Sequence, residues 1–172
     1  FIAGDITVTG GAISSFAATS STVYTATFTP SGAGATTVDV AGNKFTDPAG
    51  NNNSAATQFA WTYDNVVPTM AITSTTSGVT TGSTTNDATI ALTFTSNEAT
   101  SNFAVGDISV SGGAISSFAA TSSTVYTATF TPSGAGATTI DVNSSTFTDG
   151  AGNNNSAATQ FAWTYDNVVP TM

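Results

Sequence analysis

The 172-residue sequence contains no cysteine, no histidine and a single basic residue, Lys44. Without cysteine the chain has no disulfide framework, thiol nucleophile or zinc–thiolate site. Without histidine it has no side chain that titrates near neutrality as a general base. One cation cannot neutralise a phosphate backbone, so nucleic-acid binding is not expected. No apolar run approaches the roughly 20 residues that span a bilayer, so membrane insertion is not expected either.

Charge is scarce and almost entirely negative. Ten Asp and Glu give a formal net charge of −9, although only 6% of the residues are charged. A hydrophobic content of 40%, with 10% aromatic residues, is enough for a packed core, which excludes a solvated acidic tail. Oxygen donors are therefore the strongest chemistry that the sequence offers.

An internal repeat with a period of 102 residues organises the chain. The segment 1–6 recurs at 103–108, and the match continues without an insertion to Met70 and Met172. Solenoid repeats are about 20–50 residues long, so this longer period indicates a module that folds by itself. We predict a partial module over 1–68, with its first two strands missing, and a complete module over 69–172.

The apolar pattern within each module has a period of two. Ile90, Leu92 and Phe94 alternate with small and polar residues, and the aromatic residues of 161–165 alternate in the same way. Such alternation predicts half-buried strands, and many short strands per hundred residues predict an all-β fold of antiparallel β-sandwich modules. The predicted strands of the second module are 70–75, 88–95, 106–111, 114–118, 124–131, 137–142 and 158–165.

The first module lacks the equivalents of Ile90, Leu92 and Phe94, so we expect it to expose an apolar sheet edge. The expectation is that the chain extends N-terminally to supply the missing strands. The alternative is that a neighbouring chain donates them.

Several ordered motifs resemble the bacterial Ig-like (Big) repeats of large secreted surface proteins. They are Thr95–Ala99, Gly106-Asp107-Ile108, the run 126–132, the run 147–153 and the closing Asp166-Asn167-Val168-Val169-Pro170. The resemblance covers the second module and all that is present of the first. It implies tandem Ig-like extracellular stalk modules, commonly in adhesins and some of them stiffened by calcium, and it does not imply an enzyme.

Strand direction brings oxygen ligands to one end of the second module. The loops 96–106 and 143–157 are expected there, beside the linker 64–68. Oxygen donors without histidine or cysteine select a hard cation, and Ca²⁺ takes about 6–8 oxygens. The candidate calcium ligands are Asp64, Asn65, Glu98, Asp107, Asp149 and Asn153, with Asn155 nearby. The alternative is that these residues make local turn hydrogen bonds without an ion.

The expected function is a structural spacer in an extracellular bacterial adhesin or surface fibre, with calcium stiffening the module junction. The expected partners are neighbouring identical modules in the same or adjacent chains. The alternatives are a glycan-binding module that recognises surface glycans, and a self-assembling filament subunit completed by strand donation. Ice binding would need flat threonine ranks, which a twisted sandwich seldom offers. Glycoside hydrolysis would need a carboxylate pair in a cleft, and the sequence indicates no such pair.

Overall fold

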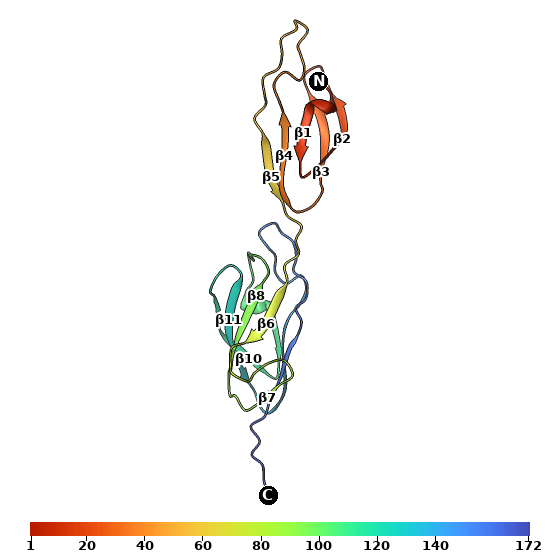
Figure 1. Cartoon of the computed structure of the whole chain (residues 1–172). Coiled ribbons are helices and arrows are strands. Elements are labelled where there is room, and N and C mark those ends of the chain that lie inside the picture. The colour runs from red at the N-terminus through yellow and green to blue at the C-terminus, as the bar shows by residue number, and fades with distance from the viewer. The chain divides into compact units, whose positions relative to one another are not determined.

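The computed structural model describes residues 1–172 and divides into two compact units, 1–66 and 67–172 (Figure 1). Apart from two three-residue 3₁₀ turns, η1 (Ala3–Asp5) and η2 (Val105–Asp107), every regular element is a β-strand. All strand pairs are antiparallel except one short parallel pair. The predicted all-β fold of Ig-like antiparallel β-sandwich modules is therefore confirmed.

Unit 2 contains two four-stranded sheets, in the orders β10-β11-β8-β6 and β7-β13-β12-β9. Its strands are β6 (Met70–Ser74), β7 (Thr84–Thr85), β8 (Ile90–Ser96), β9 (Ile108–Ser111), β10 (Gly113–Ala120), β11 (Val125–Pro132), β12 (Gly136–Val142) and β13 (Phe161–Tyr165). One sheet joins β6, β8, β10 and β11, and the other joins β7, β9, β12 and β13. This distribution is that of an immunoglobulin sandwich, in which a short second strand runs beside the last one.

The period-two pattern places the core of unit 2 between its sheets. Along β8 the buried positions are Ile90, Leu92 and Phe94, each no more than 1% exposed. Phe130 of β11 meets Trp163 of β13 edge to face, with ring centroids 6.3 Å apart, so the two sheets interlock through aromatic side chains. The inward orientation expected for the aromatic residues of β13 is confirmed.

Unit 1 repeats only the later strands of this arrangement. Its strands are β1 (Ile6–Thr9), β2 (Gly11–Ala18), β3 (Tyr24–Pro30), β4 (Gly34–Val40) and β5 (Phe59–Tyr63). They form a three-stranded sheet, β1-β4-β5, and a two-stranded sheet, β2-β3. Counterparts of β6, β7 and β8 are absent from unit 1. As a result, every buried hydrophobic side chain of the core belongs to unit 2.

All seven predicted strands of unit 2 are observed, with bounds that differ by up to three residues, and one further strand is present. Residues 106 and 107, predicted as strand, belong to η2, and β9 begins at Ile108. The last strand begins at Phe161 rather than 158, because within 158–160 only Ala158 donates a backbone hydrogen bond, to Val142. The two-residue strand β7 was not predicted, since a pair of threonines carries no alternation.

Candidate metal centre

The loop after β12 holds Asp149 in a network of its own backbone. One oxygen of Asp149, Oδ1, accepts hydrogen bonds from the backbone N–H groups of Ala151, Gly152 and Asn153, at 2.7–2.9 Å. The other oxygen, Oδ2, accepts one from the Asn153 side-chain amide at 2.8 Å. This is the local turn chemistry that the sequence left open as an alternative. The hydrogen bond from Asn153 and those from the backbone together hold the pKa of Asp149 below its usual value, although burial opposes them.

Asn155 fixes the base of the same loop. Its Oδ1 accepts from the backbone N–H groups of Thr146 and Phe147, and its amide donates to the carbonyls of Asn143 and Ser156. All of these polar contacts lie within the loop, and Asn155 is only 2% exposed. Its structural role is therefore to close the loop that presents Asp149.

Hydrogen bonds join the loop after β8 to the loop that carries Asp149. The backbone N–H of Ser101 donates to the Thr148 carbonyl, and the Ser101 hydroxyl donates to the Asp149 carbonyl at 3.0 Å. Thr100 and Asp149 also form an isolated antiparallel bridge. These contacts confirm that loops 96–106 and 143–157 meet at one end of the unit. Glu98, in the first of these loops, is thereby brought to the side of Asp149.

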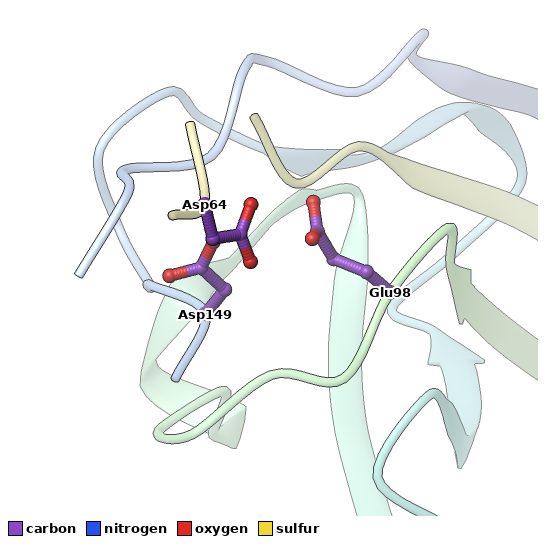
Figure 2. Close-up of side chains that lie close together, drawn as sticks. All are labelled: Asp64, Glu98 and Asp149. Atoms are coloured by element: carbon purple, nitrogen blue, oxygen red, sulfur yellow. The ribbon is translucent and has the colours of Figure 1, made fainter. Parts of the chain in front are cut away.

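Three carboxylates gather at this end (Figure 2). One carboxylate oxygen from each of Asp64, Glu98 and Asp149 lies within 4.8 Å of the other two. Asp149 is buried, while Asp64 and Glu98 are partly buried. Asp64 belongs to the segment 64–69 that leads into β6, and its Oδ1 accepts the backbone N–H of Val66 at 3.0 Å. Like charges this close repel one another, which favours a bound cation.

The other three predicted ligands have different positions. Asp107 does not belong to the group: its Oδ2 accepts the backbone N–H of Ala104 at 2.8 Å and caps η2. Asn65 is exposed to solvent. Asn153 touches the group through Asp149, to which its side chain donates. The structure thus brings together three of the six predicted residues as possible charged ligands.

This arrangement can hold a hard divalent cation. Three carboxylates in loops supply three to six oxygens, depending on whether each binds through one or both, and water can complete the 6–8 that Ca²⁺ requires. The absence of histidine and cysteine from the chain disfavours zinc and copper. The chemistry of the donors therefore fits calcium best.

Unit 1 contains the same loop network without the other two carboxylates. Asp47, the counterpart of Asp149, accepts from the backbone N–H groups of Ala49 and Asn51 and from the Asn51 side chain. The hydrogen bond from the Asn51 side chain lowers the pKa of Asp47 as well. Because the network forms in both units, it does not depend on a neighbouring carboxylate.

The sequence analysis missed the residues that bond the two loops to each other, above all Thr100 and Ser101. The Ser101 hydroxyl and the backbone of both residues join the loop to Thr148 and Asp149, which lie more than 40 positions further along the chain. Single serines and threonines are common in this chain, so no local pattern singled them out. Their only signal was the predicted convergence of the two loops.

Comparison with known proteins identifies the repeat. A family model described as the bacterial Ig-like domain matches residues 1–63 and again residues 64–165. The chain belongs to the bacterial Ig-like domain family. The second bacterial Ig-like match contains all three clustered carboxylates, Asp64, Glu98 and Asp149.

Among solved structures, the chain is similar to one described as the structure of Yersinia pseudotuberculosis InvD, with 19% sequence identity and a TM-score of 0.42. The likeness covers 97% of this bacterial Ig-like chain and 49% of the other, so the chain spans about half the length of that structure. No curated protein matches the chain. None of its helical segments has the length and apolar character needed to cross a membrane.

Proposed function

We propose that the chain is a structural spacer of an extracellular bacterial surface protein, of the adhesin or surface-fibre type. The observation that carries this proposal is the gapless 102-residue repeat, both copies of which match the bacterial Ig-like domain. Near-identical neighbours suit a spacer, because each copy needs only to fold and to separate its neighbours. Bacterial Ig-like domains are commonly surface-exposed and typically non-enzymatic, which supports an extracellular, non-catalytic role.

Surface accessibility tests the extracellular location. Antibodies raised against the 172-residue chain should label intact cells of the source organism, and protease treatment of those cells should remove the label. Antibodies against a cytoplasmic protein provide the control for cell integrity. Labelling that needs permeabilised cells would contradict the proposal.

We also propose that calcium binds to the carboxylates of Asp64, Glu98 and Asp149. The support is the three-carboxylate group, with one oxygen of each within 4.8 Å of the others, in a chain that has few charges. Extracellular modules bind calcium with dissociation constants of about 10⁻⁴–10⁻³ M. A calcium concentration about 30 times the dissociation constant would stabilise the folded copy by about 2 kcal/mol.

A matched pair of variants tests the calcium proposal. Glu98→Gln removes one charge from the group and leaves the backbone network of Asp149 intact. Asp141→Asn removes one charge from a carboxylate that accepts from Gln160 on the sheet surface and lies outside the group. In calorimetric titrations, Glu98→Gln should weaken calcium binding at least tenfold, whereas Asp141→Asn should bind like the parent chain. Equal binding by both variants would refute the assignment.

Calcium should also order the linker, because Asp64 begins the segment 64–69. On this proposal the backbone amides of Asn65, Val66 and Val67 lose fast motion when calcium is added, as measured by ¹⁵N relaxation. Chelation should restore the motion without unfolding either unit. Identical relaxation with and without calcium, at concentrations that saturate the binding isotherm, would dismiss the stiffening role.

A further inference from the structure

The two sheets of unit 2 end in four edge strands, and three of these strands are short. β6, β7 and β9 contain five, two and four residues, whereas β10 contains eight. β10 pairs with β11 on one side and has no strand on its other side. A long free edge presents a row of unpaired N–H and C=O groups with which another strand can pair. β10 is therefore the longest such edge of unit 2.

The side chains that commonly protect a sheet edge are missing from β10. Charged residues and proline keep the edges of natural sheets from pairing with one another. The run of β10, Gly-Ala-Ile-Ser-Ser-Phe-Ala-Ala, contains neither, and only 6% of the whole chain is charged. The same run forms β2 at 11–18, so each copy of the repeat carries this strand with an identical sequence. Identical strands of this kind can pair with one another where their edges are regular.

The backbone of β10 is not regular. The register of its pairing with β11 shifts between Ser116 and Ala119, where β10 has one residue more than its partner strand. Ser117, within this shift, has a φ of 51°, in the left-handed region that few residues other than glycine adopt. An extra residue in one strand of an antiparallel pair is a β-bulge, which bends that strand and increases its local twist.

The core of unit 2 does not require the extra residue. Ile115 and Phe118 both pack against the core although they are three positions apart, and Ser117 between them is exposed. Residues three positions apart on a regular strand point to opposite faces, so the bulge brings both side chains inward. Without Ser117 the same two side chains would be two positions apart, and a regular strand would bury both. The bulge thus adds an irregular edge to a pattern that would alternate correctly without it.

The bulge occurs in both copies of the repeat. In β2 the register shifts between Ser14 and Ala17, and Ser15 has a φ of 50°. β2 also lies at the end of its sheet. The same backbone irregularity at the same position of an edge strand is therefore a property of the repeat.

We infer that the extra residue Ser117 keeps the free edge of β10 from pairing with the same strand of another copy. Because the bulge bends and twists the strand, the N–H and C=O groups on its free side do not form one continuous row. An incoming strand can align with the groups before the bulge or with those after it, and it loses register between them. This inference rests on the geometry of an edge strand and is independent of the spacer role and of calcium.

Deleting Ser117 from the 172-residue chain tests the inference. The deletion leaves a strand that alternates regularly along its whole length, so the variant should associate through β10. When the protein concentration is raised from micromolar to millimolar, the backbone amides of β10 that do not pair with β11 should exchange at least tenfold more slowly in the variant. In the parent chain their exchange should not depend on concentration.

Ser117→Gly is the matched control, because glycine keeps the extra residue and adopts a positive φ without a steric penalty. This variant should behave like the parent chain at every concentration. Slower exchange of β10 in Ser117→Gly at high concentration would assign the protection to the serine side chain and overturn the inference. The inference is also overturned if the deletion variant keeps the protection of β11 and shows no dependence on concentration in β10. Loss of protection in β11 itself would show that folding requires the extra residue, and it would overturn the inference as well.

Discussion

Replacing the corresponding phenylalanine by alanine should lower the unfolding free energy of unit 2 much more than that of unit 1. Phe161→Ala in β13 removes a ring that is 3% exposed, and Phe59→Ala in β5 removes its twin, which is 65% exposed. A phenylalanine buries about 200 Å² when fully covered, so Phe161 loses roughly 120 Å² more contact area than Phe59. At about 25 cal/mol per Å² this corresponds to about 3 kcal/mol. With the cavity included, Phe161→Ala should cost about 3–5 kcal/mol, whereas Phe59→Ala, which removes only about 70 Å² of buried area, should cost no more than about 2 kcal/mol.

Each unit contains one tryptophan, which makes the assay specific. Trp163 reports on unit 2 in a Trp61→Phe background, so urea unfolding followed by its fluorescence measures the effect of Phe161→Ala alone. Trp61 reports on Phe59→Ala when Trp163 is replaced by Phe. Equal losses of unfolding free energy in the two units would refute the reasoning, because local sequence would then outweigh the covering strands.

Three further predictions concern single groups. Thr138→Val removes a buried hydroxyl that donates to the Trp163 carbonyl at 2.7 Å. In urea titrations it should lower the unfolding free energy of unit 2 by about 1–3 kcal/mol. No loss would mean that another donor replaces the hydroxyl. Gly112→Ala places a side chain at a φ of 76°, with its Cβ 2.7 Å from the Ala137 carbonyl oxygen, and should cost at least about 1–2 kcal/mol in the same assay; an unchanged midpoint would contradict it. The lowered pKa of Asp47 means that its ionised form stabilises the folded loop at neutral pH, and that this stabilisation is lost as the pH falls below about 4. The loop amides should lose their hydrogen-exchange protection over that range, and Asp47→Asn should abolish the pH dependence.

The sequence was informative where side chains alternate. β8, predicted over 88–95, is observed at Ile90–Ser96, because its inward Ile, Leu and Phe define one face. The convergence of two distant loops followed from strand direction alone. By contrast, β10 carries a register shift between Ser116 and Ala119, with Ser117 at a φ of 51°. A serine pair followed by phenylalanine gives no local sign of such a bulge.

The sequence predicted the kind of ligand at the candidate site better than it predicted which residues lie there. Asp64, Glu98 and Asp149 are grouped because loops after β8 and β12 meet the segment that enters β6. Asp107 was expected in the same group, but its side chain accepts a hydrogen bond within its own 3₁₀ turn. A carboxylate three residues after a free backbone N–H can satisfy that group locally, and sequence alone does not reveal which choice is made.

The strands β3 and β11 share the run Tyr-Thr-Ala-Thr-Phe-Thr-Pro, so they compete for β8 while the chain folds. β8 can pair with β11, from which 28 residues separate it, or with β3, from which 59 residues separate it. Since local preference is the same, connectivity alone biases the choice, and a twofold longer loop costs only about 0.6 kcal/mol, or roughly threefold in rate of encounter. About a quarter of first encounters on that basis would join β8 to the wrong copy. We therefore expect part of the chains that refold from denaturant to pair β8 with β3 first, and these chains must break that pairing before β8 can join β11.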